Sequence, residues 1–563
     1  MEKKKSWVSL FMQKIVKRTS RVRLPVRKIK VNQAGYLPSE KKIFLYTRNV
    51  ENLAGTGFKV IRASDGKVFK GRLGQAVLDQ DSGDRNYHGD FSFLTQPGRY
   101  TIKINSDESH SFEITGCKYH DLLYLSMRSY YLQRCGVGID DKISGVSHAP
   151  CHLKDSYPYD DASGKQIDTT GGWHDAGDYG KYIPSAAVTV AQLLLMYELG
   201  PRIFDAFSLD IPKTKGSEHL SDFLTELKYE LDWMLKMQDT QDGGVYYKVA
   251  SHDFPSFDIA PEDDVEIRYY FSKGTAVTAN FAGVTAMAAR VFEEADSKYA
   301  EKLRKASIQA GEFLLNTNGK VIEPSYGVTG AYLTTSVKDD LCWAYAELYR
   351  LTGKKDYWEM VLQNLENNFD PVIDWNNFTF LAINTLLACP ETPVELREKW
   401  LLTLTQWVEK IRARIAGNGY HVALTWEEYT WSSTKRALGY GVSLILAQKF
   451  LGGDFNDEIK SQLDYILGVN PLSKVYITKV GTDFVRYPHH RLAESKGALV
   501  PGLLVGGPNN RAEDGLYFRD LGPRGYVDLA AACSCNEPAI DYNAPLVFVA
   551  GYLWMREEMQ IKN

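Results

Sequence analysis

The sequence is poor in cysteine, in net charge and in long apolar runs. Its seven cysteines, an odd number for 563 residues, do not indicate a disulfide framework. A net charge of −4 gives no sign of a nucleic-acid partner over the whole chain. No stretch reaches the roughly eighteen consecutive apolar residues of a membrane-spanning helix. The composition is therefore that of a globular enzyme or binding protein, with no predicted membrane span.

The N-terminus also lacks the features of a secretory signal. Residues 1–30 carry eleven basic residues and one acid, and Gln13 and Lys14 interrupt the apolar run. No small-residue cleavage site follows it. We expect residues 1–26 to form a basic, disordered tail and the protein to be cytoplasmic; secretion by a non-standard route stays open.

Aromatic residues, in contrast, are abundant, with 34 Tyr, 24 Phe and 11 Trp. Most aromatic side chains fill cores. Tyr and Trp, however, also combine a flat apolar body with a polar tip, which suits stacking on sugar rings. Composition alone does not decide between these uses.

The pattern of apolar residues divides the chain in two. Residues 27–115 alternate apolar and polar positions between turns rich in Gly, Pro, Asp and Ser, which predicts a small all-β sandwich. From about residue 118 to 560 apolar residues recur every three or four positions, which predicts roughly a dozen helices arranged as a closed helical toroid. Loops at 135–182, 416–433 and 469–543 interrupt the helices, and such loops commonly carry function.

The most unusual loop reads GGWHDAGDYGKY and begins at residue 171. It holds Asp175 and Asp178 three residues apart, among glycines that allow close backbone approach. Two such carboxylates could bind a metal, act as a general base, or, in the case of Asp178, cap a helix starting near Ile183. The aromatic neighbours Trp173, His174 and Tyr179 argue against a simple cap.

Two further segments carry reactive side chains. SCNEPAIDYNAPL contains Glu537, and GTDFVRYPHHRLAESKG contains His489, His490 and Arg491. A loop glutamate is usually solvated, and HHR could be an exposed basic turn; alternatively, imidazole and guanidinium groups can bind hydroxyls or an anion. An acidic pair early in the toroid and a glutamate near its end fit glycoside hydrolysis, which uses one carboxylate as base and another as acid.

Several of these segments resemble one known family. VNQAGYLP, YYLQRCG with APCHLKD, GGWHDAGDYGKY, DYILGVNPLSKVYITKVGTDFVRYPHHR and YVDLAAACSCNEPAIDYNAPL occur in the order found in family 9 glycoside hydrolases. This family is also called cellulase family E, and the resemblance is to its subgroup with an N-terminal immunoglobulin-like domain. The similarity covers about residues 27–558. It implies an immunoglobulin-like β-sandwich over 27–115 and a mainly α, (α/α)6-barrel catalytic domain over 118–560.

The resemblance also implies roles for the acidic residues. Asp178 would be the general base, Asp175 would help to hold the attacking water, and Glu537 would be the general acid. The family inverts at the anomeric carbon, so the carboxylates of base and acid would lie about 6.5–9.5 Å apart. The implied activity is hydrolysis of β-1,4-glucosidic bonds in cellulose-type glucans or cellodextrins, as in an endoglucanase.

Sugar-binding residues follow from the same motifs. The expected set is Trp173, His174, Trp431, His489, Arg491 and Tyr542. Three positions depart from the family pattern: Asp483 and Cys533 replace other residue types, and WSST stands where WGSN is usual. None of these changes removes a catalytic group, but each one leaves the sugar specificity open.

Metals are implied as well, without any organic cofactor. Members of this subgroup bind structural zinc near YYLQRCG and APCHLKD, where Cys135, Cys151 and His152 match. Gly136 leaves the fourth ligand open, and His148 is the candidate; a closed Cys₂His₂ set would be structural. Buried thiols beside a loop histidine are the alternative reading. Calcium also occurs in the family, with Asp339 and Asp340 as weaker candidates.

Two other functions stay open. Some relatives are exo-acting glucosaminidases, and Asp483 or another loop acid could bind an amine at C2 of the sugar. A carbohydrate-binding relative without catalysis would have lost a carboxylate, whereas this chain retains all three. The expected partner is a β-glucan or cello-oligosaccharide, with no nucleic acid, no dockerin and no extra carbohydrate-binding module.

Overall fold

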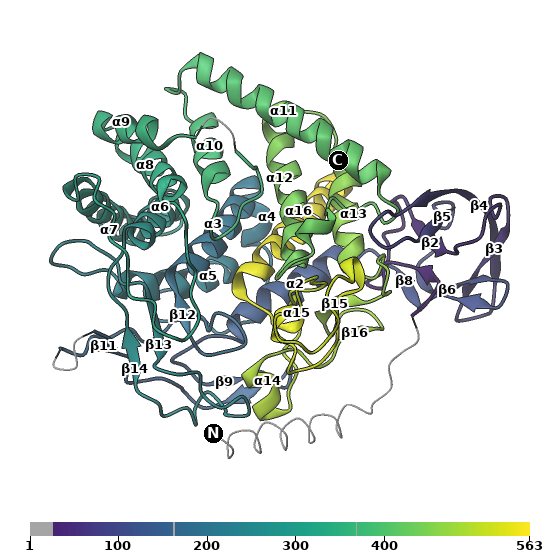
Figure 1. The fold of residues 1–563 in the computed structure, drawn as a ribbon, viewed down its shortest axis with the longest axis horizontal. Helices are drawn as coiled ribbons and strands as arrows, with labels where there is room; N and C mark the ends of the chain where they lie inside the picture. Colours follow the sequence, from purple (N-terminus) through teal and green to yellow (C-terminus); the bar gives the residue numbers. More distant parts are fainter. Residues whose placement is uncertain (1–25, 161–163, 367–368, 563) are drawn as a thin grey trace.

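The structure, a computed structural model, describes residues 26–160, 164–366 and 369–562 (Figure 1). The predicted basic tail therefore lies, up to residue 25, outside the described residues. The described chain consists of a β unit followed by a large helical unit, so the predicted fold class is confirmed. Within these ranges, no helix combines the length and the apolar character needed to cross a membrane.

The N-terminal unit is built from eight strands. In order of pairing, β1-β2-β5-β4-β3-β6-β7 form one continuous path, with β8 also paired to β6. The long strand β4 pairs antiparallel with both β5 and β3, and its register shifts between Leu73 and Ala76. The inward positions of the strands form a separate aromatic core around Phe44, Phe58 and Phe91. The strand bounds are β1 Ile29–Lys30, β2 Ile43–Thr47, β3 Gly57–Arg62, β4 Val68–Leu78, β5 Arg85–Asp90, β6 Gly98–Ile104, β7 Asp107–Glu108 and β8 Phe112–Ile114.

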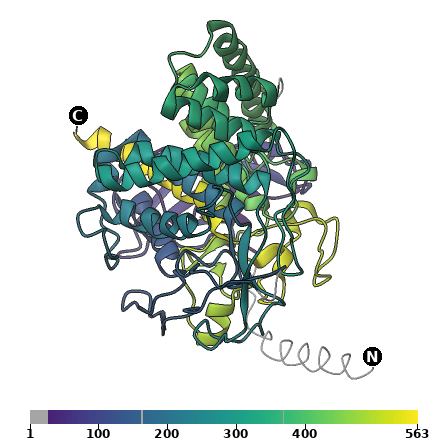
Figure 2. The same ribbon diagram turned by 90° about the vertical axis from the view of Figure 1, so that its left-hand side faces the viewer.

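The helical unit alternates outer and inner helices along the chain. The outer helices are α2 Lys118–Tyr131, α5 Asp222–Lys236, α7 Ser297–Asn316, α9 Lys355–Asn364, α11 Val394–Gly417 and α13 Asn456–Ile466. The inner helices are α3 Ile183–Leu199, α6 Thr275–Phe292, α8 Lys338–Thr352, α10 Thr379–Leu387, α12 Ser433–Leu451 and α16 Ile540–Lys562. α3 packs on α16 and α6, α6 on α8, and α8 on α10, while α12 packs on α16 (Figures 1 and 2).

The sequence explains which helices are inside. α3 is buried from Ile183 to Tyr197, and α6 is buried on nearly every side. Outer helices such as α7 and α11 bury one stripe only, as expected when apolar residues recur every three or four positions. This arrangement is an (α/α)6 barrel.

The alternation also determines where the loops lie. An inner helix follows an outer helix that runs the opposite way, so the loops preceding α3, α6, α8, α10, α12 and α16 gather at one end of the barrel. The short elements in these loops lie together at the bottom of Figure 1. Among them are β9 Ile139–Asp140, β10 Ser147–His148, β15 Val475–Thr478, β16 Phe484–Val485, α14 Arg491–Lys496 and α15 Cys533–Asn536, whereas the short helix α4 Pro201–Asp205 follows α3 and precedes α5.

A small four-stranded sheet lies at this end of the barrel. It has the order β11-β14-β13-β12, from β11 Tyr157–Pro158, β14 Arg268–Tyr270, β13 Lys248–Ser251 and β12 Lys181–Tyr182. Lys181 pairs with Val249, and Ser251 with Arg268. The loop GGWHDAGDYGKY therefore runs into a strand at Lys181.

Candidate active site

Buried side chains of helix α5 hold the loop at 171–181 in place. Glu230 accepts the Trp173 N–H at 2.6 Å, and Glu226 accepts the indole Nε1–H of Trp173 at 2.8 Å. Gly172 has φ +75°, and a Cβ there would lie 2.7 Å from the Trp233 ring. Glycine at this position thus serves both a left-handed backbone and a close approach.

This loop meets the segment that carries Glu537. The Gly177 N–H donates to Glu537 Oε1 at 3.2 Å, and the Ile540 N–H donates to the Asp175 carbonyl at 2.8 Å. A Cβ at Gly177 would lie 2.1 Å from the His489 carbonyl oxygen and 2.9 Å from Glu537 Oε1. The three motifs found in the sequence therefore come together at Gly177.

The two aspartates of the loop differ in their surroundings. Asp175 is buried, and it accepts hydrogen bonds from the Ser185 hydroxyl and, at 2.5 Å, from the Tyr332 hydroxyl. Asp178 accepts the Gly180 N–H at 3.1 Å through Oδ2, and among the described residues no other hydrogen bond to its carboxylate is found. Both carboxylate oxygens of Asp175 thus accept a hydrogen bond, whereas Oδ1 of Asp178 is still available to accept one.

The electrostatics of the site favour a protonated Glu537. Burial, with the nearby Asp178 charge adding to it, raises the pKa of Glu537 to about 8. Burial also raises the pKa of Asp175 well above its usual value, with Asp541 as the next cause. A carboxyl group that keeps its proton at neutral pH can act as a general acid.

Tyr332 was not singled out by the sequence. It lies in the loop before α8, is held there by its backbone N–H donating to the Tyr247 hydroxyl at 2.6 Å, and stands edge-on to Trp375. A lone tyrosine in a loop carries no motif, so only the fold brings it to Asp175. A cavity of about 20 Å³ beside it, bounded also by Asn280 and Asp340, is large enough for about one water molecule.

The structure places His489 and Arg491, both expected to bind sugar, beside the same loop, with their polar groups partly engaged. His489 Nδ1 contacts the Ala530 carbonyl at 2.7 Å, and its ring stacks on Phe257 at 4.6 Å. Arg491 donates from Nη1 to the Gly177 carbonyl at 3.0 Å and from Nε and Nη2 to the Pro255 carbonyl at 3.2 and 3.1 Å. Arg491 thus holds the loop in place, in addition to any contact with sugar.

The aromatic residues expected to bind sugar fall into two groups. Trp431 is 37% exposed and lies just before α12. Tyr542 is buried near Asp541 and Glu537; burial is the main cause that raises the pKa of its hydroxyl, and the charges of these two carboxylates raise it further. Trp173 is fully buried, and this corrects the expectation for that residue: a ring without exposed surface cannot stack on a sugar.

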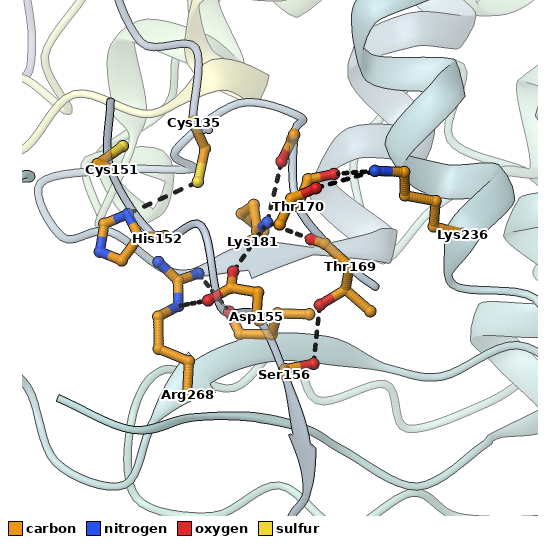
Figure 3. Close-up of polar contacts among 12 residues, drawn as sticks. Cys135, Cys151, His152, Asp155, Ser156, Thr169, Thr170, Lys181, Lys236 and Arg268 are labelled. Carbon is orange, nitrogen blue, oxygen red and sulfur yellow. Dashed lines mark hydrogen bonds and ion pairs between the residues drawn. The ribbon is translucent and has the colours of Figure 1, made fainter. Parts of the chain in front are cut away.

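His174 also differs from its expected role, because it belongs to a cluster with two cysteines. Its Nε2 lies 3.9 Å from Cys151 Sγ and 3.4 Å from His152 Nδ1, and Cys135 Sγ lies 3.6 Å from the same His152 atom. Figure 3 shows His152 facing Cys135 and Cys151. His148, the residue expected as fourth ligand, is not part of the cluster, since its Nδ1 contacts the Ala149 carbonyl at 2.8 Å.

The cluster fits a tetrahedral zinc ion. Its four ligand atoms lie within 4.8 Å of one another. Zn–S bonds of about 2.3 Å and Zn–N bonds of about 2.0–2.1 Å place ligand atoms about 3.3–3.8 Å apart in a tetrahedron. His152 Nε2 lies 3.2 Å from Asp264, the kind of carboxylate that orients a zinc-bound histidine. The residues present therefore fit a closed Cys₂His₂ site.

The calcium candidates are different. Asp340 accepts the Asn280 amide at 2.6 Å, and Asp339 accepts the Phe378 N–H at 2.9 Å. In the part of the chain that the structure describes, the Cys/His cluster is the one group of three or more such side chains at metal-binding distances.

Comparisons with known proteins match both units of the chain. A family model described as "Glycosyl hydrolase family 9" matches residues 119–550, and one described as "Cellulase N-terminal ig-like domain" matches 25–109. The cellodextrinase of Butyrivibrio fibrisolvens is 31% identical over 549 residues, covering 93% of this chain and 99% of the relative.

Solved structures are similar over the same length. A metagenome-derived glycoside hydrolase family 9 endoglucanase superimposes with a TM-score of 0.87 and 38% identity, covering 93% of this chain and 98% of that one. A Zn-binding triple mutant of the family 9 endoglucanase J30 superimposes with a TM-score of 0.86 and 34% identity, covering 92% and 99%.

Proposed function

The chain belongs to glycosyl hydrolase family 9, and from this premise we propose that it hydrolyses β-1,4-glucosidic bonds in cellulose-type glucans and cellodextrins with inversion. Glu537 is the general acid and Asp178 the general base. The observation that supports these roles best is the hydrogen bond from the Gly177 N–H to Glu537. Gly177 stands between Asp175 and Asp178 in the loop, so this bond brings Glu537 against the segment that carries both aspartates.

The acid step depends on the proton of Glu537. The raised pKa, about 8, keeps this proton in place at neutral pH. As the glycosidic C–O bond breaks, Glu537 donates the proton to the leaving oxygen, so that the departing sugar leaves as an alcohol. The Gly177 N–H then stabilises the carboxylate that is left behind.

The base step uses the acceptor capacity of Asp178. A water molecule on the opposite face of the ring loses a proton to Asp178 while its oxygen forms the new bond to the anomeric carbon. Asp175, held by Ser185 and Tyr332, fixes the backbone on which Asp178 stands and helps to hold that water. Exposed Trp431 supplies a surface on which a sugar ring can stack.

The decisive experiment is hydrolysis of cellopentaose, followed by chromatography of the products and by NMR of the first-formed anomer. Inversion of a β-linkage gives the α-anomer first. Asp178→Ala and Glu537→Gln should each lower kcat by about 10²–10⁴-fold while leaving oligosaccharide binding measurable by calorimetry. Normal turnover by either variant would refute the assigned roles.

The alternative substrate, a glucosamine oligomer, finds little support at Asp483. This carboxylate pairs with Lys474 Nζ at 3.1 Å, and the backbone N–H of Asp483 donates to Gln33 of the β-sandwich at 2.8 Å. An amine-binding acid would need to be free to pair with the substrate. Release of glucosamine from chitosan oligomers, with cellopentaose left intact, would reverse this conclusion.

We also propose that a structural zinc ion occupies the Cys/His cluster, held by Cys135, Cys151, His152 and His174. Four protein ligands leave no open position, so the ion would stabilise the fold and take no part in bond breaking. His174 directly precedes Asp175, so the cluster also anchors the catalytic loop.

A further inference from the structure

Lys181 ends the catalytic loop and is completely buried, which is unusual for a lysine. Its ammonium group donates to the carbonyls of Thr169 at 2.7 Å and Gly171 at 2.9 Å, and it lies 3.2 Å from Asp155 Oδ2 (Figure 3). Two hydrogen bonds and one ion pair therefore engage this ammonium group. Because Thr169 and Gly171 begin the segment that Lys181 ends, the ammonium group closes the segment on itself.

Asp155 links this closed segment to the small sheet. Its Oδ1 lies 3.5 Å from Arg268 Nε, and Arg268 in turn donates to the Val249 carbonyl at 3.3 Å. Val249 is the strand partner of Lys181. Lys181, Asp155, Arg268 and Val249 therefore form a closed circuit through one ion-paired carboxylate and the three strands β12, β13 and β14.

The same circuit adjoins the Cys/His cluster. Asp155 follows Cys151 and His152 in the chain, and its carbonyl accepts the Thr169 N–H at 3.3 Å. The hydroxyls of Ser156 and Thr169 are also hydrogen-bonded, at 2.7 Å. The segment bearing two of the zinc-site residues is therefore fastened to the start of the catalytic loop, as Figure 3 shows.

We propose that Lys181 is a positioning residue of the active site: by tying Thr169, Gly171 and Asp155 together, it holds the loop of Asp175 and Asp178 in register with Glu537. This inference rests on the proposed roles of those carboxylates. Lys181 acts through the backbone and touches no substrate. Loss of the ammonium group leaves two buried carbonyls and one oxygen of Asp155 without their partner, so the loop relaxes while the barrel stays intact.

The consequence for catalysis is a loss of rate. A displacement of about 1 Å in a catalytic group can cost about 10²-fold in rate. Sugar contacts made by other elements, such as that of Trp431 in the loop before α12, are unaffected. Lys181→Met, which keeps the length of the side chain, should therefore lower kcat by about 10–10²-fold and change KM on cellopentaose by less than about threefold.

The matched control is Lys42→Met. Lys42 is equally buried and also donates to backbone carbonyls, those of Leu37, Pro38 and Glu40, but it lies in the β-sandwich. Both variants should lower the melting temperature, and only Lys181→Met should lower kcat. Asp155→Asn, which keeps an oxygen acceptor for Lys181, provides a milder second variant if Lys181→Met does not fold; its kcat should fall in the same direction.

Hydrogen exchange measured by mass spectrometry gives a readout independent of activity. Peptides covering 169–181 should exchange faster in Lys181→Met and in Asp155→Asn than in the natural chain, and those of the β-sandwich should not change. Unchanged exchange over 169–181, or a kcat no lower than that of Lys42→Met, overturns the inference. If the natural chain leaves cellopentaose intact, the proposed function fails, and the exchange comparison still decides the role of Lys181.

Discussion

The backbone N–H of Gly177 donates to Glu537 Oε1 at 3.2 Å, although 360 positions separate the two residues in the chain. This bond places the proposed acid directly against the loop that carries the proposed base. It also explains why the loop needs a glycine there, since any Cβ would meet Glu537 and His489.

Gly177→Ala tests this relationship. The added Cβ would lie 2.1 Å from the His489 carbonyl oxygen, so the loop must shift away from Glu537. We expect kcat to fall by about 10²-fold, and the melting temperature to fall as well, because the new Cβ meets a backbone atom. Gly417→Ala, whose Cβ meets no atom within 4 Å, is the control and should keep full activity. Equal activity of the two variants would show that the close approach does not matter for the reaction.

The pH dependence of the reaction follows from Glu537. Its pKa of about 8 means that the carboxyl group is protonated below that pH and loses its proton above it. Because the general acid must carry its proton, kcat/KM should stay level through neutral pH and fall about tenfold per pH unit above about 8. A pH–rate profile on a soluble cellodextrin measures this limb. A fall that begins near pH 5 would contradict the raised pKa.

Tyr332→Phe removes a hydroxyl that donates to Asp175 at 2.5 Å. This hydrogen bond lowers the pKa of Asp175 and so opposes the larger effect of burial, which raises it. Its loss should raise the pKa of Asp175 further and, because Asp175 helps to hold the attacking water, reduce kcat by about tenfold. Tyr326→Phe, in the same loop, is a suitable control because its hydroxyl contacts Glu323 instead. A kcat in Tyr332→Phe equal to that of Tyr326→Phe would argue against this role of Tyr332.

The sequence was sufficient to predict the fold class and the motifs, because the period of apolar residues and the order of the motifs are local properties. It also placed Asp178 and Glu537 in one site through the resemblance. It could not assign Trp173, since the partners that bury this ring, Glu226 and Glu230, lie more than fifty positions away on α5. For Tyr332 there was no signal at all, because its hydrogen bond to Asp175 spans 157 positions.

The proposed zinc ligands illustrate the same limit. His148 is near Cys151 in the chain and was therefore expected as the fourth ligand. The fold instead turns the His148 ring toward the Ala149 carbonyl, and the catalytic loop carries His174 to the cysteines. Closeness in sequence was thus a poor guide, because the fourth position is filled across a tertiary contact.

Replacing each of these two histidines by alanine gives a direct test of the proposed zinc site. His174→Ala removes one of four ligands, so we expect metal content, measured by mass spectrometry of the purified protein, to fall well below one zinc per chain. His148→Ala should retain about one zinc per chain. Chelation of the natural chain should lower its melting temperature, and the His174→Ala variant should show little further decrease.

Since His174 directly precedes Asp175, His174→Ala should also speed hydrogen exchange in the catalytic loop, whereas His148→Ala should not. Loss of zinc from His148→Ala with retention in His174→Ala would reverse the ligand assignment.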